Sequence, residues 1–178
     1  MADLLNGIPR VDVSSGPTGF RRLISRIPTT RLGAAIHRRL LAPIDVRLMR
    51  MTGGHVSSVF GIVPLVVLRT TGARSGTQRD TPVGYFTDGD DVILIASNYG
   101  RAEHPGWYYN LLKRPECELL ADGVEGRGGR FIAHLTKGAD RDRLFALAQR
   151  YSPNYIVYAE RTMGVREMPV FRLAPKAP

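Results

Sequence analysis

Apolar and polar positions follow two different periods along this chain. Within residues 19–52 the apolar positions recur every four residues, which predicts an amphipathic helix. These positions are Ile36, Leu40, Ile44 and Leu48. Pro43 interrupts the series and should kink or split the helix, because proline removes a backbone donor. Residues 1–18 carry glycine and proline without apolar periodicity, so we expect a flexible leader there.

Residues 53–178 instead alternate short β-branched or aromatic runs with turn residues, which is typical of strands. We expect strands at residues 62–69, 82–87, 92–97, 117–121, 129–136 and 168–173, and helices at 105–113, 140–151 and 154–162. Residues 88–91, Asp-Gly-Asp-Asp, predict a hairpin between the second and third strands. About six strands with helices inserted between them predict an α+β domain built on a small barrel covered on one side.

Composition favours a cytoplasmic protein. No run approaches the roughly 18 apolar residues of a membrane-spanning helix, and the first residues lack the basic-then-apolar order of a signal peptide. Cys117 is the only cysteine, which excludes an intramolecular disulfide and a thiolate zinc site. Its place in a predicted strand indicates a buried packing role.

The basic charge is concentrated near the start of the chain. The formal net charge is +9, and residues 1–60 hold nine arginines against three acids, so 9 − 3 = +6. Nucleic acid, an anionic membrane surface and a polyanionic small molecule all suit such a surplus. No nucleic-acid-binding motif is present, so we expect no nucleic-acid partner. Residues 20–51 are compatible with peripheral contact to the inner face of the cell membrane, or with a helix packed on its own domain. Nothing in the pattern specifies an oligomeric state.

The sequence contains no recognisable set of residues that would catalyse a reaction without a cofactor. The chain lacks a Gly-x-Ser-x-Gly elbow, and Ser75 and Ser97 have no histidine and acid in the expected neighbourhood. The histidines are scattered at positions 37, 55, 104 and 134, without a metal-ligand spacing. A site of this kind usually takes its reactivity from a cofactor.

Two polar, glycine-marked connections predict an anion-binding pocket. In residues 68–85, Gly72 and Gly76 permit a tight turn that can present Arg74 and Ser75 to one anion. In residues 93–110, Pro105 suits the first position of a helix whose free amides would point toward the same ligand. Together they predict a pocket for a flat anionic molecule.

Aromatic residues gather in two later places. Trp107, Tyr108 and Tyr109 follow Pro105, while Tyr151, Tyr155 and Tyr158 are spaced by four and three residues. That spacing places the last three on one helical face, unless Pro153 breaks the register. Such a face suits a packed core or a lid over a flat ring, and the pattern leaves both readings open.

These segments, taken in order, resemble the deazaflavin (F420)-dependent nitroreductase family, whose fold is a split β-barrel. The resemblance runs from about residue 48 to residue 173. It is carried by residues 68–76, 79–82, 95–98 and 105–111 and by the three later tyrosines.

The resemblance implies coenzyme F420, an 8-hydroxy-5-deazaflavin, as cofactor. Its phosphate would be held by Arg74, Ser75, Gly76 and Arg79. Its ring would be lined by Pro82, Ile95, Ala96, Ser97 and Asn98. Its wall would be completed by Gly106, Trp107, Tyr108, Tyr109 and Asn110. Tyr155 would close over the cofactor, while Ser97, Tyr151 and Tyr158 would face the electron acceptor.

The implied reaction is hydride transfer from reduced deazaflavin to a small electrophilic acceptor, namely a quinone, an activated enone or a nitroaromatic. Ala73 and Asn98 stand where relatives commonly have basic residues, so we expect Arg79 or an N-terminal arginine to compensate for the lost charge. Gly84 stands where relatives can have an aromatic residue, so we expect a roomier acceptor pocket. The alternatives are an FMN-dependent split-barrel oxidoreductase and a non-catalytic F420 carrier or peripheral membrane protein.

Overall fold

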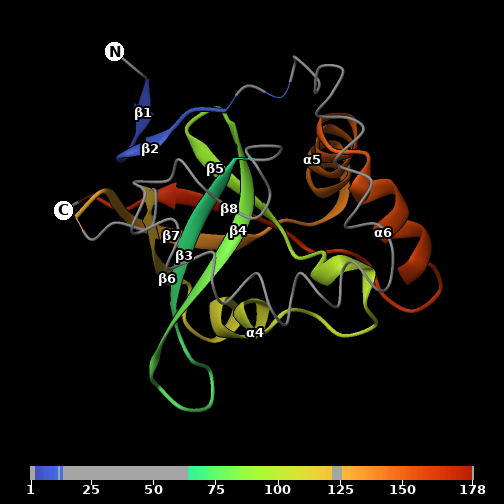
Figure 1. The fold of residues 1–178 in the computed structure, drawn as a ribbon, viewed down its shortest axis with the longest axis horizontal. Coiled ribbons are helices and arrows are strands. Elements are labelled where there is room, and N and C mark those ends of the chain that lie inside the picture. Colours follow the sequence, from blue (N-terminus) through green and yellow to red (C-terminus); the bar gives the residue numbers. More distant parts are fainter. Residues whose placement is uncertain (1–2, 12, 14–63, 122–125, 178) are drawn as a thin grey trace.

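The computed structural model describes residues 3–11, 13, 64–121 and 126–177, and the helix predicted within residues 19–52 lies outside them. Six strands close into an antiparallel barrel in the order β3-β4-β5-β8-β7-β6 (Figure 1). Their bounds are β3 Leu65–Thr71, β4 Gln78–Asp88, β5 Asp91–Ile95, β6 Glu116–Leu120, β7 Gly128–Leu135 and β8 Val170–Pro175. The predicted α+β barrel is confirmed.

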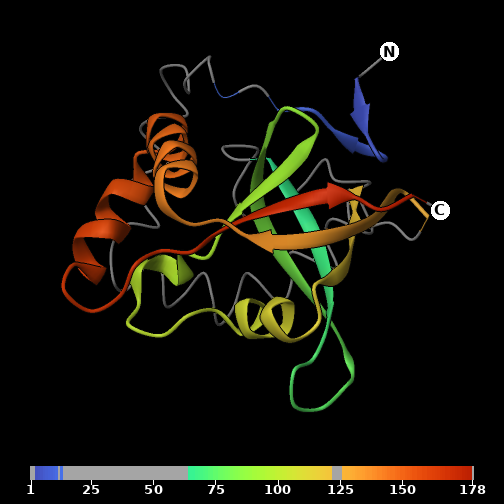
Figure 2. The ribbon, with the colours of Figure 1, turned by 180° about the vertical axis from the view of Figure 1, so that it is seen from behind.

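In the described part of the chain, three helices pack beside the barrel: α4 Gly106–Lys113, α5 Gly138–Tyr151 and α6 Asn154–Thr162. A short 3-10 turn, η3 Asn98–Gly100, follows β5. Helices α5 and α6 lie together beside the barrel, α4 crosses below it, and the β3–β4 connection extends past α4 (Figures 1 and 2). A helix break at Ser152 and Pro153 separates Tyr151, on α5, from Tyr155 and Tyr158, on α6.

Strand β5 explains how the barrel and the helices share one core. Its run Val92-Ile93-Leu94-Ile95 is buried at every position. Val92 and Leu94 face the barrel interior, while Ile93 and Ile95 pack with Leu144 of α5. Because both faces are covered, the strand is continuously apolar and does not alternate with polar residues.

The chain's first described residues form a hairpin, β1 Leu4–Leu5 and β2 Ile8–Pro9. Leu5 and Ile8 are buried in the barrel's hydrophobic cluster, and the Tyr85 hydroxyl donates to the Pro9 carbonyl at 3.0 Å. The prediction of a flexible leader over residues 1–18 is therefore wrong for residues 3–11, which pack on the barrel. Asn6 and Gly7, at φ 47° and 81°, form the two-residue turn that an Asn-Gly pair favours.

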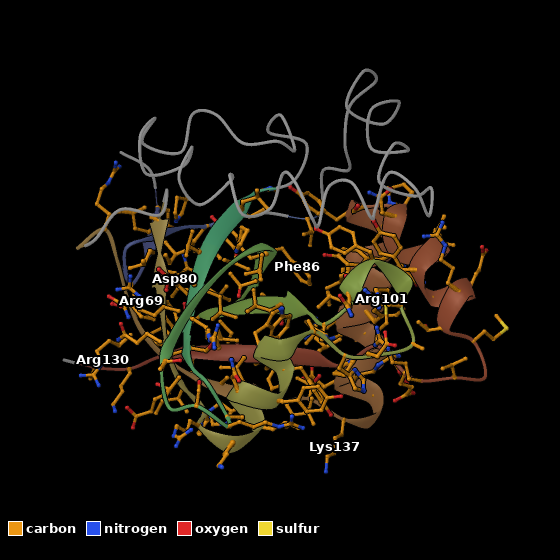
Figure 3. All side chains as sticks on the ribbon, turned by 60° about the horizontal axis from the view of Figure 1, so that its bottom comes forward. Arg69, Asp80, Phe86, Arg101, Arg130 and Lys137 are labelled. Carbon is orange, nitrogen blue, oxygen red and sulfur yellow. The ribbon has the colours of Figure 1, made fainter. Side chains whose placement is uncertain are left out.

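Ion pairs on the outer surface join neighbouring strands. On β3, Arg69 pairs with Asp80 of β4 at 2.9 Å and with Glu118 of β6 at 3.4 Å (Figure 3). Such cross-strand pairs favour the observed register. Among the described helices, none is long and apolar enough to cross a membrane.

Arg172 is the centre of a second charged network, and its loss should weaken the fold. Its guanidinium donates to Asp88, Asp91 and Asp140 at 2.8–3.0 Å. These side chains are partly exposed, so we expect Arg172→Met to lower the free energy of unfolding by about 1–2 kcal/mol at neutral pH, measured by urea denaturation. Arg130→Met is the control, because the Arg130 side chain is 66% exposed; an equal effect in both variants would contradict this role for Arg172.

The same network predicts a loss of stability in acid. Hydrogen bonds from Arg172 lower the pKa of Asp140 to about 2, and those from Arg143 lower the pKa of Asp88. A carboxyl group whose pKa is lower in the folded state stabilises the fold above its unfolded pKa, near 4. We therefore expect the difference in stability between wild type and Arg172→Met to shrink as the pH falls from about 4 toward 2. A constant difference across this range would contradict the pairing.

Candidate functional site

A pocket of about 1000 Å³ opens where the β3–β4 turn, strand β4, the loop after β5, α4 and the start of α6 meet. Most of the residues predicted for the site line it: Arg74, Ser75, Arg79, Pro82, Ile95, Ser97, Asn98, Gly106, Trp107, Tyr109, Asn110, Tyr155 and Tyr158. The barrel thus brings together segments that are separated by up to 84 residues in the sequence, from position 74 to position 158.

Four predicted residues lie outside this lining. The Ala96 side chain is fully buried in the barrel core. Tyr108 is not among the lining residues, and its ring stacks on His104, with ring centroids 4.2 Å apart. Gly76 lies in the turn of residues 72–77 between β3 and β4, which we call the basic turn, and Tyr151 is the last residue of α5. Their contacts with a cofactor or an acceptor remain predictions.

The basic turn owes its shape to hydrogen bonds within itself. The Gly72 amide donates to the Thr77 carbonyl at 2.8 Å, and the Gly76 amide donates to the Gly72 carbonyl at 2.9 Å. Gly76 has a φ of 70°, which glycine adopts with little strain. A Cβ at Gly72 would meet the Ser75 hydroxyl, which lies 2.8 Å from the Thr77 hydroxyl. Residues 74–79 are left exposed at the pocket's edge.

The pocket is positively charged. Arg74, Arg79 and Lys113 are the basic residues in its lining, and no acidic residue lines it among those the structure describes. Within that part of the chain, none of the three forms an ion pair. Lys113 was not predicted as a site residue from the sequence. Its spacing from Gly106, Tyr109 and Asn110 on α4 places it on the same helical face, and that spacing was the available signal.

Tyrosines form part of the pocket wall. The rings of Tyr155 and Tyr158 lie 6.4 Å apart and nearly perpendicular, and the Tyr99 ring lies 6.2 Å from Tyr158. Burial is the main cause that raises the pKa of Tyr155 to about 12, and burial also raises the pKa of Tyr158. Both phenols therefore stay protonated near neutral pH and are able to donate hydrogen bonds to a ligand.

Tyr99 was also missed, because its position depends on backbone conformation. Asn98 and Tyr99 both adopt positive φ, at 45° and 57°. The Asn98 side chain donates to the Glu103 carbonyl at 2.8 Å, and the Arg161 guanidinium reaches the Tyr99 carbonyl at 3.5 Å. Such left-handed residues cost free energy and persist where their surroundings hold them.

Arg166 holds the loop that follows β5 through several hydrogen bonds. Its guanidinium donates to the carbonyls of Ser97 at 2.8 Å and Arg101 at 2.9 Å, and contacts His104 Nδ1 at 3.2 Å. Burial, followed by the nearby Arg166 charge, lowers the pKa of His104, so Nδ1 is free to accept a hydrogen bond from the guanidinium. Arg101 marks this end of the molecule in Figure 3, far from Arg69 and Asp80.

The closed six-stranded barrel places the protein in the class of split β-barrel proteins. The chain also matches the sequence model of the F420H(2)-dependent quinone reductases over residues 42–175, and it belongs to that family.

Individual relatives and solved structures are similar to this chain. The chain is 35% identical over 144 residues to an F420H(2)-dependent quinone reductase of Mycobacterium tuberculosis, covering 76% of this chain and 95% of the relative. The solved structure of the F420-H2 dependent reductase FDR-A is similar, with 31% identity and a TM-score of 0.52, covering 62% of this chain and 93% of that one. A domain-swapped dimer has 27% identity and a TM-score of 0.54, covering 71% and 93% of the two chains.

Proposed function

We propose that this protein is an oxidoreductase that uses F420H2 to reduce a quinone. Family membership supports this function, as do the relatives named for the same activity. The observation that best supports this function is one pocket lined by both three basic residues and a group of tyrosines. Among the described residues, none of the three basic side chains has an acidic partner.

The residues of the pocket fit the cofactor. F420 combines a flat deazaflavin ring with a phosphate and an oligoglutamate tail. Arg74, Arg79 and Lys113 would hold the anionic part, because guanidinium and ammonium groups donate to phosphate oxygens. On the apolar side, Pro82, Ile95 and Trp107 would contact the ring. Trp107 is itself 7% exposed and fixed against Phe171 at 5.9 Å, so this surface is preformed.

The bound reduced cofactor would supply a hydride from its central ring. The protein's own contribution is to place an acceptor against that ring and to exclude water. Ser97, Tyr99 and Tyr158 line the pocket, and in this proposal they would hydrogen-bond the carbonyl oxygens of the acceptor. Reduction of a quinone to a hydroquinone takes one hydride and one proton, and the proton would come from solvent or from a pocket tyrosine.

The range of acceptors extends beyond quinones in this proposal. Gly84 lines the pocket without a side chain, which leaves room for a substituted ring. Activated enones and nitroaromatics share the electron-poor, planar character of a quinone and would fit the same wall. Tyr99 and Tyr155 would then select flat acceptors over bulky ones.

Anaerobic titration of the purified protein with reduced F420 and menadione tests the function. We expect the F420H2 absorbance to be lost in proportion to menadione added, and only when protein is present. A yellow protein with a flavin spectrum and no response to F420 would favour the FMN-dependent alternative. Tight F420 binding without oxidation across quinones, enones and nitroaromatics would favour a carrier.

Peripheral membrane contact through residues 20–51, with a cytoplasmic location, is a further part of the proposal. The basic amphipathic pattern of this segment supports it. We expect the full-length chain to co-sediment with vesicles that contain anionic lipid, and charge-neutral vesicles to retain much less. Equal recovery with both vesicle types, or with neither, would contradict this contact.

A further inference from the structure

The side chain of Asn110, on α4, bridges to the basic turn. Its Oδ1 atom accepts a hydrogen bond from the Ala73 amide at 2.8 Å, and its Nδ2 atom donates to the Thr70 hydroxyl at 3.0 Å. Thr70 is 2% exposed, so this end of the bridge is anchored in the fold. Arg114 adds a bond from its guanidinium to the Gly72 carbonyl at 3.0 Å.

The turn has few other attachments in the described part of the chain. The ladder between β3 and β4 ends at the pair Thr71 and Gln78. Beyond that pair the turn bonds chiefly to itself, and it projects away from the barrel past α4 (Figures 1 and 2). An exposed turn of this kind samples many conformations unless other elements hold it. Its attachment to α4 therefore decides where Arg74 lies.

We propose that Asn110 is a positioning residue for the anion site. It fixes the Ala73 amide, and with it the direction in which Arg74 leaves the turn, so that the guanidinium is in place before a phosphate arrives. The inference rests on the proposed function, because the phosphate is that of F420. It differs from the cofactor contact predicted for Asn110 from sequence, since the side-chain amide is engaged by the protein itself.

A comparison of two ligands tests this role. One ligand is F420, and the other is its deazariboflavin fragment, which lacks the phosphate and tail. For Asn110→Leu we expect F420 to bind about three- to tenfold more weakly, as loss of one or two hydrogen bonds implies. The fragment should bind as it does to wild type. Fluorescence titration gives both dissociation constants, and thermal melting records stability separately.

Thr70→Val provides a second, nearly isosteric variant that removes only the anchor of the Nδ2 bond. We expect a smaller loss of F420 affinity, and less than additive losses in the double variant, because both changes break one bridge. Leu112→Ala, an exposed change on the same helix, should alter neither ligand.

Equal weakening of both ligands in Asn110→Leu would overturn the proposal, since it would indicate general loss of structure. Unchanged F420 affinity in both Asn110→Leu and Thr70→Val would overturn it as well. Failure of the wild-type protein to bind F420 would instead refute the proposed function.

Discussion

Replacing Arg74 and Arg79 together with alanine is expected to weaken F420 binding by about a hundredfold. Each guanidinium would form charge-assisted hydrogen bonds worth about 1.5–3 kcal/mol, and exposure to solvent favours the lower end of that range. Both residues are exposed and line the pocket, and the lining contains no described acid that competes with the ligand. Isothermal titration at two salt concentrations measures the loss.

The matched control removes two positive charges elsewhere. Arg130 and Lys137 are exposed and lie outside the pocket lining (Figure 3). Their double alanine variant should bind F420 within about threefold of wild type, because distant surface charges are screened by salt. If the Arg74 and Arg79 double variant behaves like this control, the phosphate is bound elsewhere.

Arg166→Leu is expected to have the largest effect on stability. Arg166 donates to the Ala96, Ser97 and Arg101 carbonyls, and the change leaves these acceptors without that donor. The bonds to Ala96 and Ser97 are partly buried, and each unsatisfied acceptor there costs about 1–3 kcal/mol, so we expect the free energy of unfolding to fall by about 2–4 kcal/mol. In a domain of this size the melting temperature should drop by roughly 5–15 °C.

Two further variants test whether the stabilisation by Arg166 depends on its hydrogen bonds or only on its positive charge. Arg166→Lys keeps the charge but not the planar fork of donors, so it should recover only a minor part of the lost stability. Arg101→Leu changes an exposed arginine in the same loop, whose side chain contacts Glu103 at 3.3 Å, and should cost less than about 0.5 kcal/mol. If Arg166→Leu and Arg101→Leu unfold alike, the loop does not depend on Arg166.

Local signals in the sequence were sufficient for most of the fold. The Asp88-Gly89-Asp90-Asp91 hairpin is confirmed, with Asp88 opposite Asp91 and Gly89 at a φ of 59°. The predicted bounds of α6 match the observed helix. Cys117 is buried, as expected, and burial raises the pKa of its thiol to about 12. These features depend on residues close together in the chain, which is why their pattern predicts them.

Long-range contacts, an unusual backbone conformation and very short strands account for most of what was missed. Arg166 bonds to carbonyls 65 to 70 residues away, and no local pattern encodes such a contact. Tyr99 enters the pocket through a left-handed backbone that its residue type disfavours. The hairpin at Asn6 and Gly7 carried a recognisable turn signal, but a two-residue strand on each side is too short for periodicity to show.

A crystal structure of the protein with F420 tests the central claim most directly. The account predicts that the phosphate lies within hydrogen-bonding distance of Arg74 or Arg79, with the deazaflavin ring between Trp107 and the wall formed by Tyr155 and Tyr158. Density for the cofactor elsewhere on the protein, or a pocket closed by its own side chains under saturating F420, would contradict it.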